Sequence, residues 1–261
     1  MGLERCIEEK ILPLVDEKYK VFMARLIPNI PRERIIGVRV PQLRKIAKEV
    51  SKLEGVSQFL KSLPHKYIEE DYIHAFIIAA VPRSDVAFSL IDKFLPYVDN
   101  WATCDSLRPA IDDGNETRAM LLSYIDGWLS SPRAFTRRFA IEMLMLHFLN
   151  DGVFKPEFLD TVAAIAPKDA PQPSERKCRI GKAEGTSRKY SGMPPEEYYL
   201  KMMVAWYFAE ALVKQYGEAV AYFEERRLDI WTHNAAIKKA RESFRISPEK
   251  KEHLSSLAVK K

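Results

Sequence analysis

A tryptophan and an aspartate that lie four residues apart are the residues of this chain best suited to chemistry. Trp101 and Asp105 bound the run Trp-Ala-Thr-Cys-Asp, and positions i and i+4 of a helix share one face. Taken alone, the pair is better explained as a core tryptophan beside a surface aspartate. With Arg138 and Trp206 further along the chain, it supplies an aromatic surface, a carboxylate and a guanidinium, which together suit a cationic or nucleic-acid ligand.

Arg138 and Trp206 also lie in segments that read as packed helix. Phe135 and Phe139 form an apolar stripe at helical spacing, and Arg138 lies beside that stripe. A charge on this flank needs a partner or a ligand, because an unpaired buried charge is costly. Trp206 belongs to the run Met-Met-Val-Ala-Trp-Tyr-Phe-Ala, which is typical of a helix core.

Other catalytic signatures are missing from the sequence. It has no GxSxG, no P-loop, no GxGxxG and no HExxH motif, so several hydrolase, nucleotide-binding and metalloprotease classes are excluded. The five histidines are scattered, without metal-ligand partners at useful spacing. Solvated helix faces or turn caps explain the acidic runs at 69–71 and 112–113.

Composition places the chain among ordinary soluble globular proteins. Of its 261 residues, 47% are hydrophobic and 30% are charged, and the net charge is +5 with a pI near 8.9. This mildly basic balance does not by itself establish nucleic-acid binding. Three widely spaced cysteines without a CxxC pair fit a reducing compartment. No apolar stretch has the length of a membrane span, so we expect a cytoplasmic protein, and a monomer.

Helical periodicity dominates the whole chain. Pro13 predicts a break in the first helical segment, Pro41 suits the first turn of the next helix, and Ser84 suits an N-cap. The lengths and short turns are typical of helix pairs that stack as an α-solenoid of the HEAT or armadillo kind; the alternative is an irregular helical bundle. Helices are expected at about 3–26, 41–53, 55–62, 68–81, 85–97, 101–111, 116–130, 133–149, 156–166, 195–215, 217–227, 231–245 and 248–257.

Two segments concentrate positive charge. An irregular stretch at about 167–194 is rich in proline, glycine, serine and basic residues, as in a functional loop or a solvated linker. The second segment is the C-terminal helix at 231–245. Both could contact phosphates, and the basic residues concerned, with Arg137, are Arg188, Lys189, Lys238, Lys239, Arg241 and Arg245.

The order and spacing of these pieces resemble the DNA alkylation repair family of HEAT-like-repeat glycosylases, the AlkD-like proteins. Each piece alone is weakly specific, but together they cover most of the chain. The matching runs are Gly37-Val-Arg-Val-Pro-Gln-Leu-Arg, Asn100-Trp-Ala-Thr-Cys-Asp-Ser-Leu, Thr136-Arg-Arg-Phe-Ala-Ile, Tyr198-Tyr-Leu-Lys-Met-Met-Val-Ala-Trp and Asn234-Ala-Ala-Ile-Lys-Lys-Ala-Arg.

The resemblance implies one helical-repeat domain over 1–261, curved, with a concave face that binds duplex DNA containing alkylated bases. It also implies cleavage of the N-glycosidic bond of N3- or N7-methyl purines without a metal or cofactor. The family's functional positions fall on Trp101, Asp105, Arg138 and Trp206. Asp105 would stabilise positive charge on the sugar and position a water, the tryptophans would pack against the deoxyribose, and Arg138 would hold a phosphate.

Two departures from the family pattern keep other functions open. Asn100 stands where some members have a second aromatic residue, and the segment 167–194 precedes the Trp206 helix. One alternative is a DNA-structure-binding protein of the same fold without catalysis, which would show salt-dependent affinity but no base release. The other is a protein–protein scaffold, the commonest use of HEAT-type solenoids, which would lack affinity for duplex DNA.

Overall fold

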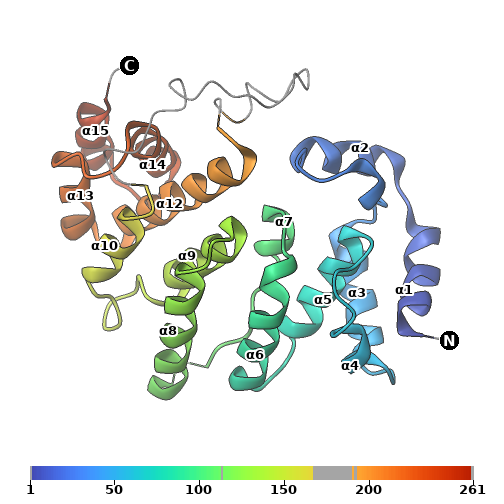
Figure 1. Ribbon diagram of the computed structural model, residues 1–261. Helices are drawn as coiled ribbons and strands as arrows, with labels where there is room; N and C mark the ends of the chain where they lie inside the picture. Colours follow the sequence, from blue (N-terminus) through green and yellow to red (C-terminus); the bar gives the residue numbers. More distant parts are fainter. Residues whose placement is uncertain (1, 113, 167–189, 191–192, 260–261) are drawn as a thin grey trace. The chain divides into compact units, whose positions relative to one another are not determined.

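The computed structural model describes residues 2–112, 114–166, 190 and 193–259, and this part of the chain consists of helices, turns and loops without a strand. The all-helical prediction is thereby confirmed. The sequence predicts one domain, and in the structure the chain divides into two compact units, Met1–Gly127 and Trp128–Lys261. Figure 1 traces the helices of both units from blue to red.

The first unit is built around α5, which packs against α3 and also contacts α6 and α7. Its core is rich in isoleucine and includes Ile7, Ile35, Ile46, Phe59 and Ile73. The helices are α1 (Leu3–Ile11), η1 (Leu12–Leu14), α2 (Glu17–Leu26), η2 (Arg32–Arg34), α3 (Val40–Val50), α4 (Val56–Phe59), α5 (Ile68–Ala79), α6 (Ser84–Phe94), η3 (Leu95–Tyr97) and α7 (Trp101–Cys104).

The second unit is built around α12, a 20-residue helix that packs against both α9 and α14. Helix α8 (Asn115–Leu129) leads into this unit. Its further helices are α9 (Ala134–His147), α10 (Glu157–Ala163), α12 (Pro195–Lys214), α13 (Tyr216–Glu224), α14 (Ile230–Glu242) and α15 (Pro248–Leu257). No helix in the described ranges is both long and apolar enough to cross a membrane.

Prolines set several helix boundaries as the sequence predicts. Pro13 lies in η1, between α1 and α2, and Pro41 lies in the first turn of α3. Two expectations are wrong. Ser84 is the first residue of α6 and Arg83 is the N-cap. The helix expected at 101–111 is only α7, four residues long; Pro109 disfavours helical geometry at the residue before it, so the chain leaves the helix early.

Most of the basic segment at 167–194 lies outside the described residues. The structure describes Tyr190, Met193 and Pro194 from it, and the first two are buried. The predicted DNA contacts Arg188 and Lys189 fall outside the described residues.

Candidate active site

Trp101 and Asp105 occupy the two ends of the short helix α7. Asn100 caps this helix: its Oδ1 accepts the N–H of Thr103 at 2.8 Å, and its Nδ2 donates to Thr103 Oγ1 at 3.0 Å. Asp105 is the C-cap residue, and its N–H donates to the Trp101 carbonyl at 2.9 Å. Asn100 is fully buried, so the residue that departs from the family pattern has a defined structural task, which an aromatic side chain could not perform.

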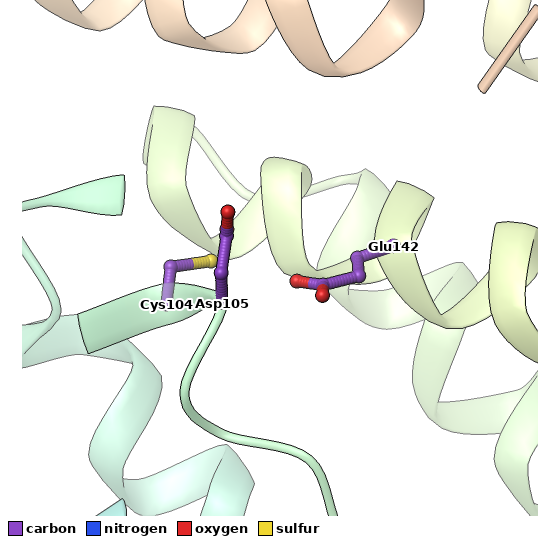
Figure 2. Close-up of side chains that lie close together, drawn as sticks. All are labelled: Cys104, Asp105 and Glu142. Atoms are coloured by element: carbon purple, nitrogen blue, oxygen red, sulfur yellow. The ribbon is translucent and has the colours of Figure 1, made fainter. Parts of the chain in front are cut away.

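The Trp101 ring is half-buried and fixed by a hydrogen bond. Its indole N–H donates to the carbonyl of Leu26, at the end of α2, at 3.2 Å, and its apolar edge packs against the core of the first unit. Asp105 is also half-buried. Figure 2 shows its carboxylate beside the Cys104 thiol at the end of α7. Trp101 and Asp105 are therefore each partly packed and partly open to solvent. The interpretation as a core tryptophan beside a surface aspartate does not describe this fully, and neither does the interpretation as an open ligand surface.

A chain of charged groups holds the segment that enters α7. Arg34, in η2, pairs with Asp99 and also with the buried Asp71, whose Oδ2 lies 3.0 Å from Nη2. The Asp99 carboxylate in turn accepts a hydrogen bond from Asn100 Nδ2 at 3.1 Å, and its carbonyl accepts one from Asn29 at 2.7 Å. Arg34 thus connects the first turn of α5 to the cap of the helix that carries Trp101 and Asp105.

Burial and the Arg34 guanidinium act on the pKa of Asp71 in opposite directions. Burial raises the pKa of the Asp71 carboxyl well above its usual value, and the Arg34 guanidinium opposes that rise. Removing the guanidinium would leave a buried carboxylate without its charged partner, which is strongly destabilising.

The acidic run 69–71 lies inside the protein, so its interpretation as a solvated helix face is wrong, and its interpretation as a cap is confirmed for Glu70 alone. Glu69 Oε1 accepts the N–H of Gly37 at 2.7 Å, and the same carboxylate accepts the N–H groups of Ile36 and Val38. Glu70 accepts the N–H of Tyr67 at 2.8 Å, at the start of α5. Burial raises the pKa of both glutamates, and these backbone donors oppose the rise.

Gly37 is needed for this arrangement. Its φ is +100°, and a Cβ added there would lie 2.7 Å from the Lys20 Cβ and 2.8 Å from the Asp16 carbonyl oxygen. Both the backbone angle and the lack of space exclude other residues. Gly37 is also the first residue of the run Gly37-Val-Arg-Val-Pro-Gln-Leu-Arg, on which the family resemblance partly rests. The local backbone therefore requires glycine at the first position of that run.

Two histidines that the sequence leaves scattered form a buried pair. His65 Nε2 lies 2.8 Å from His74 Nδ1, and Phe59 and Phe94 stack on the two rings. Burial lowers the pKa of His65 to about 4 and that of His74 to about 3. Both rings are therefore neutral at pH 7 and serve packing.

In the second unit, Arg138 is buried between helices. It lies on α9, is 4% exposed, and donates from Nη1 to the Tyr199 carbonyl of α12 at 2.8 Å. Glu142 follows one helical turn later and is fully buried; Figure 2 shows its side chain on α9. Glu142 is not among the residues predicted from the sequence, although an acid four residues after an arginine in an apolar helix is a recognisable signal.

Trp206 lies on α12, half-buried, with the ammonium of Lys239 on α14 5.9 Å from its ring centre. Lys238 and Arg241 are exposed on α14. Arg245, just beyond α14, is also exposed, and its Nη2 lies 2.5 Å from Glu210 Oε1 on α12. The structure therefore brings Trp206 together with Lys239 among the predicted C-terminal basic residues.

Arg137 differs from these exposed cations. It is half-buried, burial lowers its pKa, and its Nε lacks a hydrogen-bond partner among the described residues. It lines a pocket of about 360 Å³ whose other charged residues are Glu196, Glu197 and Lys201. Lys201 is itself buried and lies 3.5 Å from both Glu197 and Asp229. The acids balance the cations, so this pocket is not a basic one.

The four residues that the resemblance makes functional thus fall in both compact units. Trp101 and Asp105 lie together on α7 in the first, whereas Arg138 and Trp206 lie on α9 and α12 in the second. A comparison with family profiles matches residues 7–183 to the DNA alkylation repair enzymes. The chain belongs to this family.

The extent of the family match bears on the site. The matched range includes Trp101, Asp105 and Arg138, and ends before α12 and Trp206. No curated protein matches the chain. Membership in the DNA alkylation repair family supports a role in DNA repair. The matched range covers the first unit from Ile7 onward and continues through α8, α9 and α10.

Proposed function

We propose that this DNA alkylation repair protein is a glycosylase that hydrolyses the N-glycosidic bond of N3- or N7-methylated purines in duplex DNA. The observation that carries the proposal is the half-buried Asp105, which follows the last residue of α7 as its C-cap, while the Trp101 ring at the start of α7 is fixed by its hydrogen bond to Leu26. The helix itself is held by the Asn100 cap and by Arg34. A carboxylate that is positioned in advance stabilises developing positive charge without reorganisation during the reaction.

The chemistry requires little more than such a group. Methylation makes the purine cationic, so when the bond from C1′ to the base nitrogen breaks, its electron pair neutralises the departing base. The sugar is left as an oxocarbenium-like cation, the charge that glycosidases of other folds meet with carboxylates. We propose that Asp105 stabilises this cation and accepts the proton of the water that adds to C1′. The products are the free base and an abasic site.

The remaining residues are given supporting tasks. The rings of Trp101 and Trp206 would pack against the deoxyribose and backbone, with cation–π stabilisation of about 0.5–2 kcal/mol each. Lys238, Lys239 and Arg241 would neutralise phosphates. For Arg138, which is buried and bonded to α12, we propose a positioning role in place of a direct phosphate contact.

The test is release of methylated base by the wild-type protein. A duplex treated with a methylating agent is incubated with the protein, and free 7-methylguanine and 3-methyladenine are quantified by mass spectrometry alongside abasic sites. We expect the free methylated bases, taken together, and the abasic sites to appear in equal amounts. Affinity for duplex DNA without release of methylated base would support the alternative of a DNA-structure-binding protein. The absence of both duplex affinity and base release would support the protein scaffold.

A further inference from the structure

One phenylalanine stands apart from the apolar residues of this protein. Phe244, in the connection between α14 and α15, is 93% exposed, whereas the next most exposed large apolar residues in the described ranges, Leu12 and Phe22, are 54% and 53% exposed. An aromatic ring in full contact with water is unfavourable by the free energy of its unburied apolar surface. Because its exposed fraction is far above that of the other large apolar residues in the described ranges, Phe244 is the candidate among them for contact with a ligand.

The residues around Phe244 are anchored, so the ring is displayed by an ordered connection. The Ser243 hydroxyl accepts the N–H of Arg245 at 3.2 Å, and the Arg245 guanidinium pairs with Glu210 on α12. Ile246 is buried, with 4% exposure, and the Ser247 hydroxyl caps α15 by accepting the N–H of Lys250. Each neighbour of Phe244 has a partner in the fold, and its own ring points to solvent.

The chemistry around the ring identifies the kind of ligand. Lys238 and Arg241 are exposed three residues apart on α14, and neither has an ion pair among those found between described residues. Glu210, which holds Arg245, lies four residues after Trp206 on α12, so the connection and Trp206 lie on the same side of that helix. Phe244 follows Arg241 by three residues along the chain. Proteins stack on nucleic-acid bases with exposed aromatic rings while nearby cations hold the backbone.

We propose that Phe244 stacks on a DNA base that has lost its pairing partner, while Lys238 and Arg241 hold the flanking phosphates. The inference rests on the proposed function, because base release leaves an abasic site and an unpaired base opposite it. In an intact duplex the faces of the bases are covered by their neighbours. A gap in the stack exposes a base face, which an inserted apolar side chain can cover.

The experiment compares two duplexes of one sequence, intact or with a single tetrahydrofuran abasic analogue. The wild-type protein should bind the abasic duplex more tightly. Phe244→Ala should lose about tenfold in affinity for the abasic duplex and keep its affinity for the intact one, whereas Phe244→Tyr should behave as wild type. Phe22→Ala, which removes an exposed phenylalanine of α2, is the matched control and should change neither affinity.

A spectroscopic readout separates stacking from a general loss of affinity. With 2-aminopurine opposite the abasic analogue, the wild type and Phe244→Tyr should quench its fluorescence, and Phe244→Ala should not. If Phe244→Ala matches Phe22→Ala in both affinity and quenching while wild type releases methylated bases, the stacking inference is overturned and the proposed function stands. If the wild-type protein binds neither the intact nor the abasic duplex, both the stacking inference and the proposed function are contradicted.

Discussion

The two compact units position their functional residues in different ways. In the first, charged groups are directed inward: Arg34, Asp71 and Asp99 are linked in one network, and Glu69 is satisfied by three backbone N–H groups. In the second, Arg138 is hydrogen-bonded to α12 and the buried Lys201 lies 3.5 Å from both Glu197 and Asp229. Lys238, Arg241 and Phe244 of this unit are exposed. We propose that the network of the first unit fixes the reactive group and that the exposed cations of the second unit hold a polyanion.

The charged network of the first unit can be disrupted by a substitution at Arg34. Arg34→Met should lower the free energy of unfolding by about 3 kcal/mol, because it leaves the buried Asp71 carboxylate without its partner. It should also slow base release, since the cap of α7 depends on Asp99. Chemical denaturation and a single-turnover release assay measure the two effects.

The matched control for this variant is Arg39→Met, which removes a guanidinium from an exposed pair with Asp16. Exposed pairs contribute little, so the control should keep wild-type stability and wild-type release. Equal losses in both variants would mean that the Arg34 network has no special role.

The buried histidine pair makes the first unit sensitive to acid. Burial lowers the pKa values of both histidines, so at mildly acidic pH the unfolded chain binds more protons than the folded chain does. The free energy of unfolding therefore falls as the pH falls from about 6.5 towards 4. In His65→Gln, the loss in unfolding free energy between pH 7 and pH 5 should be smaller by about 2 kcal/mol. The raised pKa values of Glu69, Glu70 and Asp71 act in the opposite direction, and comparison of the variant with wild type removes their contribution.

Denaturation curves at the two pH values provide the measurement. His253→Gln, at an exposed position in the second unit, should leave the wild-type pH dependence unchanged. If the unfolding free energy of His65→Gln falls between pH 7 and pH 5 by as much as that of the wild type, the histidine pair does not control stability in acid.

The smallest effect is expected at the outward-facing cations of α14. The double variant Lys238→Ala/Arg241→Ala should bind intact duplex several-fold more weakly, and the slope of log K against log salt should become shallower by roughly 1.8. Release at saturating protein should stay at the wild-type rate. The charge-matched control is Lys45→Ala/Lys48→Ala on α3, where both residues are exposed; an equal change in slope there would remove the assignment of DNA contacts to the second unit.

Much of the fold was accessible to sequence reasoning because helix periodicity and prolines act locally. Pro13 and Pro41 end or begin helices through their own geometry. The buried acids were less accessible, because what satisfies Glu69 is a set of N–H groups more than thirty residues earlier in the chain. For the same reason the pairing of His65 with His74 and the exposure of Phe244 depend on tertiary packing.

The candidate site was predicted from the sequence only through its resemblance to a family. Trp101 begins α7 and Asp105 is its C-cap, while the spacing alone favours ordinary packing. Their half-burial results from a hydrogen bond to Leu26 and from a helix that ends after four residues. The catalytic roles of Trp101, Asp105, Arg138 and Trp206 stay predictions.

The most direct test of the account is the single-turnover rate constant for 7-methylguanine release by Asp105→Asn. The substitution keeps the size of the side chain and removes its charge. We expect a fall of about 10²–10³-fold, with wild-type affinity for the duplex, while Asp92→Asn at an exposed position of α6 keeps the wild-type rate. An unchanged rate in Asp105→Asn would contradict the assignment of the reaction to the carboxylate of α7.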